Sequence, residues 1–170
     1  MVFVIKIGGN VLDDPAALQD FLHAFASVSG PKILVHGGGK IATRLGDQLG
    51  IQSNYVDGRR ITDDATIDLV TMVYGGLVNK QLVAQLQSRH CNAIGITGAD
   101  GNLLPAVKRP VKTIDYGWVG DVRADSLPVE RWKLLLDNGL FRYWHPLPMM
   151  VMAISSIPMQ ILWLPPLPLQ

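Results

Sequence analysis

The chain has 170 residues, with 15 Lys and Arg against 14 Asp and Glu, so its formal net charge is only +1. A nearly neutral chain offers no electrostatic basis for binding nucleic acid or an anionic membrane surface. The hydrophobic fraction of 48% excludes wholesale disorder. The single cysteine, Cys91, excludes an internal disulfide framework and a cysteine-based zinc site. The sequence holds no apolar run long enough for a transmembrane helix and no signal-peptide pattern at its start. We therefore expect a cytoplasmic protein in which Cys91 is a small buried residue.

Strands and helices alternate along residues 1–140. Short apolar runs predict strands at 2–7, 32–36 and 92–97, and the first two end in glycines. Helical spacing predicts helices at 16–28, from the second glycine cluster to Leu49, at about 64–87 and at 128–138, the last capped by Gly139. The chain has capping sequences before two of these helices, Asp13-Asp14-Pro15 and Thr62-Asp63-Asp64.

Two further segments have turn chemistry. Residues 55–61 predict a hairpin around Asp57-Gly58. Residues 103–123 predict short antiparallel pieces with turns at Tyr116-Gly117 and Gly120. The order of elements predicts an α/β fold, with a mostly parallel sheet and helices on both faces.

The predicted helix at 64–87 has apolar residues on more than one face, and Gly75-Gly76 lies in its middle. Each glycine lowers helix stability by about 1 kcal/mol relative to alanine. One interpretation is a helix buried on all sides. The other is a helix with one face on the sheet and one on a partner subunit, with the glycines permitting close approach.

Two glycine clusters each follow a strand and precede a helix: Gly8-Gly9-Asn10 and Gly37-Gly38-Gly39-Lys40. Glycine allows backbone N–H groups to turn toward an anion, and ligands of open α/β sheets bind at the carboxyl ends of the strands. Neither cluster matches the dinucleotide or Walker patterns, and tight strand-to-helix turns also use glycine.

Charged residues near these clusters are candidates for the site. Lys6 lies two residues before Gly8, where its amine could reach a bound phosphate or extend outward into solvent. The pair Arg59-Arg60 follows the predicted hairpin turn and could bind a carboxylate through a fork of donors, or be two solvated turn residues. His36 is assigned no role beyond a structural hydrogen bond. Asp100 and Asp121 are explained as turn residues.

Together these pieces resemble the amino-acid kinase family, and within it the members that act on acylglutamates. The resemblance extends over residues 1–139. The strings that carry it are Val4-Ile5-Lys6-Ile7-Gly8-Gly9, Val35-His36-Gly37-Gly38-Gly39, Gly58-Arg59-Arg60-Ile61-Thr62, Met72-Val73-Tyr74-Gly75-Gly76-Leu77-Val78-Asn79-Lys80 and Gly95-Ile96-Thr97-Gly98-Ala99-Asp100. The third and fourth strings separate acylglutamate-type kinases from the aspartate, uridylate and carbamate kinases of the same fold.

The resemblance implies the N-terminal, substrate-binding lobe of a three-layer α/β/α sandwich at residues 1–140. It implies ATP-dependent phosphorylation of the γ-carboxylate of N-acetyl-L-glutamate in arginine biosynthesis, with Mg²⁺ bridging the ATP phosphates and no metal ligand from the chain. Such transfer requires positioning and charge stabilisation rather than a covalent nucleophile. It also implies a homodimer formed through the helix at about 64–87.

Site residues follow from the same resemblance. Lys6 is the catalytic residue that neutralises the transferring phosphoryl group. Phosphate is bound by backbone N–H groups of Gly8, Gly9 and Gly37, and the substrate by Gly37, Gly38 and Arg60. Two rival interpretations remain open: a related kinase for N-succinylglutamate or an aminoadipate-type substrate, and a non-catalytic ligand-binding or regulatory half-domain.

Residues 141–170 differ sharply from the rest. They contain no Gly, Asp, Glu or Lys, a single charge at Arg142, six of the eleven prolines and four of the six methionines. Ordinary domains are about 25% charged. The family's Asn-x-Asn-Ala-Asp motif, whose aspartate organises the catalytic lysines, and its nucleotide-binding half are both missing. We expect this tail to be disordered and the chain as written to have little or no kinase activity.

The genetic code indicates how such a tail arises. Reading the tail one base earlier forces Leu-Ala from the codons of Tyr143-Trp144-His145 and Gly-x-Gly from those of Met150 to Ala153. The same frame forces an alanine at Met159-Gln160 and permits Asn-Thr-Asn-Ala-Asp around it. We infer that residues from about 140 onward are the out-of-frame product of a net one-base loss. A genuine divergent tail is the alternative.

Overall fold

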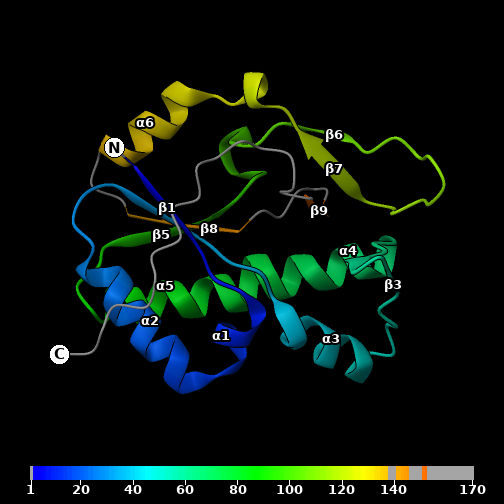
Figure 1. The fold of residues 1–170 in the computed structure, drawn as a ribbon, viewed down its shortest axis with the longest axis horizontal. Helices are drawn as coiled ribbons and strands as arrows, with labels where there is room; N and C mark the ends of the chain where they lie inside the picture. The colour runs from blue at the N-terminus through cyan, green and yellow to red at the C-terminus, as the bar shows by residue number, and fades with distance from the viewer. Residues whose placement is uncertain (1, 138–140, 146–150, 153–170) are drawn as a thin grey trace.

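A computed structural model describes residues 2–137, 141–145 and 151–152. At its centre is a four-stranded sheet in the order β1-β2-β8-β5, formed by β1 (Phe3–Lys6), β2 (Lys32–Val35), β8 (Phe141–His145) and β5 (Ala93–Thr97). Every pairing in this sheet is parallel, as predicted. Figure 1 shows the sheet between two layers of helices.

One layer holds α1 (Gly9–Asp13), α2 (Pro15–Ser27), α3 (Gly39–Gln48), α4 (Asp64–Val70), the π-helical η1 (Thr71–Val78) and α5 (Asn79–Gln87). The other holds α6 (Val129–Asp137), which lies across the sheet from α2 and α5 (Figure 1). Each layer has its own core. Ile7 and Leu34 pack with Leu22, Leu69 and Leu82 on one face of the sheet. Ile33 and Val35 pack with Trp132 on the other. The predicted α/β fold with helices on both faces is confirmed.

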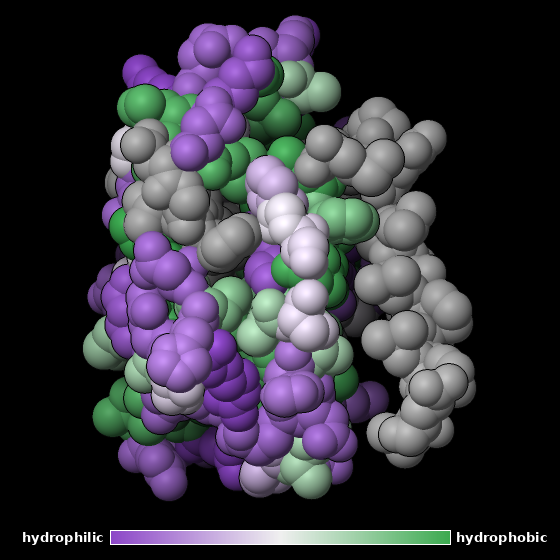
Figure 2. Space-filling model, turned by 90° about the vertical axis from the view of Figure 1, so that its left-hand side faces the viewer, coloured by the Kyte–Doolittle hydropathy of each residue, from purple (hydrophilic) through white to green (hydrophobic). Residues whose placement is uncertain are grey.

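The remaining elements are short. A hairpin of β3 (Tyr55–Val56) and β4 (Arg59–Arg60) lies beside α3, and β6 (Ala106–Lys108) pairs antiparallel with β7 (Val119–Val122). Two 3₁₀ turns, η2 (Asp100–Asn102) and η3 (Ala124–Ser126), complete residues 2–137. None of the helices in the described ranges combines the length and apolar character needed to cross a bilayer. Polar residues cover much of the face seen in Figure 2, with apolar residues scattered between them.

Local capping explains where the helices begin and end. Asp14 accepts hydrogen bonds from the backbone N–H groups of Ala16 and Ala17, with Pro15 in the first turn. Lys32 closes the other end of α2: its buried ammonium donates to the carbonyls of Phe25, Ala26 and Val28 at 2.8, 3.0 and 2.6 Å. Burial lowers the pKa of Lys32. Asp63 caps α4 by accepting from Thr66 N–H.

The segments α4, η1 and α5 follow without interruption, so the predicted long helix is present, with π-helical geometry around Gly75-Gly76. Its inner face is buried, whereas Met72 is 53% and Leu77 is 44% exposed. Burial on all sides is therefore wrong for this chain. The helix covers the sheet with one face and leaves an apolar face uncovered.

Strand β1 is partly buried and lies at the edge of the described sheet, and Lys6 is exposed at its end. Two local predictions need correction. Gly120 and Asp121 belong to β7 and not to turns. Asp121 forms an ion pair with Arg109, the first residue of the loop between β6 and β7. Cys91 is buried, as predicted.

Within the tail after residue 140, the structure describes seven residues, all in strands. Phe141–His145 forms β8 between β2 and β5, and β9 (Val151–Met152) pairs with β7. The other residues of this tail lie outside the described part of the chain, as does the predicted cap at Gly139.

Residues around Thr62 join the two hairpin regions. Thr62 N–H donates to the carbonyl of Tyr116, and Trp118 N–H donates to the carbonyl of Thr62. Gly117 has φ of +71°, and a Cβ atom there would lie 2.1 Å from the Thr62 carbonyl oxygen. Only glycine therefore fits this crossing.

Candidate functional site

A cavity of about 400 Å³ lies among α1, α3, the β3–β4 hairpin and η1. It brings together two residues predicted from sequence, Gly9 and Arg60. Six lining residues were not predicted: Asn10, Asp13, Lys40, Thr43, Tyr55 and Tyr74. The predicted residues Lys6, Gly8, Gly37 and Gly38 are not among those that line the cavity.

Arg60 is held by hydroxyl groups. Its Nη1 donates to Ser53 Oγ at 2.5 Å, and its Nη2 donates to Thr43 Oγ1 at 3.1 Å and to Tyr55 Oη at 2.5 Å. The Tyr55 ring lies 5.0 Å from the guanidinium carbon. No carboxylate in the described residues forms an ion pair with Arg60. The guanidinium is thus oriented while its charge remains available for an anionic ligand.

Gly38 and Tyr74 form one wall of this region. A Cβ atom at Gly38 would lie 1.6 Å from Cε1 of Tyr74, so the ring occupies the space that a larger residue would need. Burial raises the pKa of Tyr74, the positive charge of Arg60 lowers it, and Tyr55 raises it. The structure therefore explains Gly38 by packing. The only sign of this contact in the sequence is that Gly38 and Tyr74 lie in two of the strings that resemble the family.

Unlike Gly38, Gly8 and Gly37 have open space where a side chain would lie. A Cβ atom at either would meet nothing within 4 Å, and neither residue has a positive φ. Neither packing against described residues nor backbone geometry therefore requires glycine at these positions. The open space at the ends of β1 and β2 is what a ligand approaching the backbone needs.

Lys6 ends β1 just before Gly8. Its side chain is exposed and makes no hydrogen bond or ion pair with another described residue. His36, at the end of β2, is only 1% exposed, and its Nδ1–H donates to the carbonyl of Gly37 at 3.0 Å. Burial lowers the pKa of His36 to about 4, whereas the hydrogen bond to Gly37 raises it. His36 is therefore neutral at physiological pH and structural, as predicted.

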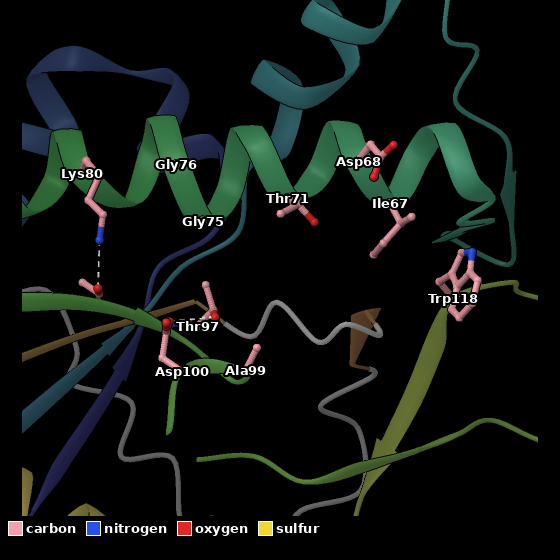
Figure 3. A pocket seen from close by; sticks show the side chains of 11 residues that line it. Ile67, Asp68, Thr71, Gly75, Gly76, Lys80, Thr97, Ala99, Asp100 and Trp118 are labelled. Carbon is pink, nitrogen blue, oxygen red and sulfur yellow. Dashed lines mark hydrogen bonds between the residues drawn. The ribbon is translucent and has the colours of Figure 1, made fainter. Parts of the chain in front are cut away.

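A second cavity, of about 620 Å³, lies between the long helix and the end of β5 (Figure 3). Lys80 bridges its two walls by donating to the carbonyl of Gly95, and Asp100 accepts hydrogen bonds from the Thr97 backbone and hydroxyl groups. Its charged side chains are exposed, and no predicted site residue lines it. Despite its size, we therefore assign the chemistry to the cavity around Arg60.

The described residues contain no group of three or more His, Cys, Asp or Glu side chains able to hold a metal ion. They do contain cationic and backbone donors suited to anions: Lys6, Lys40, Arg60 and the open glycine turns. This donor set fits a phosphate or carboxylate ligand.

Comparison with known proteins agrees with this chemistry. A family model described as the amino acid kinase family matches residues 1–142. Acetylglutamate kinase of Cytophaga hutchinsonii is 60% identical over 123 residues, covering 72% of this chain and 47% of that protein. Acetylglutamate kinase of Bacteroides thetaiotaomicron is 60% identical over 119 residues, covering 70% and 46%. The chain therefore spans about half the length of these curated relatives.

Solved structures agree on the fold. The structure of N-acetylglutamate synthase from Neisseria gonorrhoeae, complexed with coenzyme A and N-acetyl-glutamate, matches with a TM-score of 0.66. It is 22% identical, covering 88% of this chain and 34% of that one, and so supports the fold alone. The family match covers more than four fifths of the chain. The chain belongs to the amino acid kinase family.

Proposed function

We propose that this chain is the substrate-binding lobe of an enzyme that phosphorylates the γ-carboxylate of N-acetyl-L-glutamate with ATP and Mg²⁺, in the cytoplasm, during arginine biosynthesis. The observation that carries the proposal is Arg60, oriented by three hydroxyls beside glycine turns that have open space. We infer the substrate from the name of the curated relatives, acetylglutamate kinase.

Each group of residues has a separate role in binding or transfer. Arg60 binds a substrate carboxylate through its fork of donors. Lys6, whose side chain pairs with no other described residue, neutralises charge on the transferring phosphoryl group. Backbone N–H groups around Gly8, Gly9, Gly37 and Gly38 orient phosphate and substrate for in-line attack. Mg²⁺ bound to the ATP phosphates would supply further charge neutralisation, and the described residues contain no group of three or more His, Cys, Asp or Glu side chains to hold it on their own.

Binding and turnover separate in this proposal. We expect the 170-residue chain to bind N-acetylglutamate, and turnover to require the longer chain that restoring one base near codon 140 produces. Calorimetry with N-acetylglutamate tests the first point, and an acyl-phosphate assay on both chains tests the second. Turnover by the purified short chain, or no binding by it, would contradict the assignment. A panel of N-succinylglutamate and N-acyl-aminoadipate tests the rival kinases, and binding without turnover by the restored chain favours the regulatory half-domain.

We further propose that the uncovered face of the long helix forms a homodimer. Met72 and Leu77 are exposed on it, and the neighbouring Gly75-Gly76 backbone permits close approach of a second helix. Sedimentation analysis of Leu77→Lys should show a monomer, whereas Leu134→Lys, which alters a more exposed leucine on α6, should leave the assembly unchanged. A dimer that persists in Leu77→Lys contradicts this interface.

A further inference from the structure

The hydrogen bonds of Arg60 have a consequence for how it can receive a carboxylate. A guanidinium has five N–H groups: one on Nε and two on each terminal nitrogen. Two acceptors, Thr43 Oγ1 and Tyr55 Oη, share Nη2, and Ser53 Oγ occupies one side of Nη1. Among the residues that the structure describes, no acceptor is bound to the Nε–H group or to the second N–H of Nη1.

The Nε–H group and the N–H group of Nη1 do not lie on the same edge of the guanidinium. A carboxylate that binds with two parallel hydrogen bonds needs both N–H groups of one edge. One such edge consists of Nη1 and Nη2, and the other of Nε and Nη2. Both edges include Nη2, so a carboxylate cannot bind Arg60 in this way until one hydroxyl leaves that nitrogen.

Tyr55 is the hydroxyl that can leave. It is 51% exposed and belongs to a two-residue strand, whereas Thr43 and Ser53 are partly buried. Its ring, 5.0 Å from the guanidinium carbon, can keep its contact with the cation after the hydroxyl has moved. Water can then solvate the released hydroxyl, so that no buried group is left unsatisfied.

We propose that Tyr55 is a placeholder on Arg60, whose hydroxyl is displaced from Nη2 by the ligand carboxylate, while Thr43 and Ser53 remain bound as positioning residues. The exchange favours the ligand because hydrogen bonds between charged partners are about twice as strong as those between neutral ones. The identity of the ligand as N-acetylglutamate rests on the proposed function, but the exchange requires only a carboxylate.

The proposal predicts opposite effects for two hydroxyl deletions. In the 170-residue chain, Tyr55→Phe removes a competitor and keeps the ring, so N-acetylglutamate and the plain dicarboxylate glutarate should bind about fivefold more tightly. Thr43→Val removes a support of Arg60 and should weaken both ligands about tenfold. Tyr116→Phe is the matched control and should change neither. In the parent chain, ¹³C-labelled tyrosine signals should show Tyr55 shifting as ligand is added.

Each outcome decides something. Weaker binding by Tyr55→Phe, or equal losses in both variants with unchanged thermal stability, would overturn the placeholder while leaving the function intact. If glutarate binds more tightly to Tyr55→Phe and more weakly to Thr43→Val, but N-acetylglutamate does not bind, the displacement of Tyr55 is supported and N-acetylglutamate is refuted as the substrate. If neither ligand binds the parent chain or Tyr55→Phe, both ideas are wrong.

Discussion

Burial of His36 makes the stability of the chain depend on pH in a defined window. Its pKa is about 4 in the folded chain, against an ordinary value of 6.5, because burial disfavours the imidazolium ion. Between these values the unfolded chain binds a proton that the folded chain does not. The free energy of unfolding therefore falls as pH drops from 6.5 toward about 4, and this group causes no further loss below that.

The expected loss is about 3 kcal/mol, since each pH unit between the two pKa values corresponds to 1.36 kcal/mol. That is a large fraction of a typical domain's stability of 5–15 kcal/mol. Asp63, whose hydrogen bonds with Thr66 lower its pKa, loses its contribution only below its ordinary value of 3.8. The two windows therefore do not overlap.

Urea unfolding at about pH 7, 5.5 and 4.5 measures the effect. His36→Gln should lower stability at neutral pH but remove most of the dependence between these values. The control, His23→Gln, alters an exposed histidine on α2 and should keep the full dependence of the parent chain. If the parent chain and His36→Gln lose the same stability on acidification, the reasoning from burial is refuted.

Three further substitutions test packing and capping by urea unfolding. Gly38→Ala should destabilise by about 2 kcal/mol, since its methyl group overlaps the Tyr74 ring, and adding Tyr74→Ala should cost less than the separate effects predict; additive effects would contradict the contact. Lys32→Met should cost about 3 kcal/mol because three carbonyls at the end of α2 lose a charged donor; a neutral result would show that they find other donors. Asp14→Ala should cost about 1 kcal/mol through loss of the α2 cap, whereas Asp20→Ala, on the same helix, should cost little; equal losses would contradict capping.

Much of the fold could be predicted because its signals are local. An apolar run that ends in glycines marks β1 and β2, and an aspartate before a proline marks the start of α2. Strand order is not local. The edge position of β1, and with it the exposure of Lys6, depends on which distant strands pair. Asp121 was taken for a turn residue because its partner Arg109 lies across the β6–β7 pair.

The site divides in the same way. Arg60 and Gly9 lie in strings that resemble a family, so they could be found without a structure. Thr43, Ser53 and Tyr55 could not, because ordinary hydroxyl residues carry no pattern until the hairpin folds against α3 and brings them to one guanidinium. The out-of-frame origin of the tail stays a prediction, and the family match that ends at residue 142 lies close to the predicted boundary.

The crossing of Thr62 and Gly117 has a mechanical consequence. Thr62 follows the β3–β4 hairpin by two residues and is tied by two backbone hydrogen bonds to the segment that leads into β7. The Trp118 indole adds a third tie by donating to Asp64 in the first turn of the long helix. Because Gly117 has no side chain, the two backbones approach closely, and these bonds hold the hairpin that carries Tyr55, the start of α4 and the base of β7 together. One end of this connection carries Tyr55, which lines the Arg60 cavity, and the other carries Trp118, which lines the second cavity, so the crossing links the walls of both.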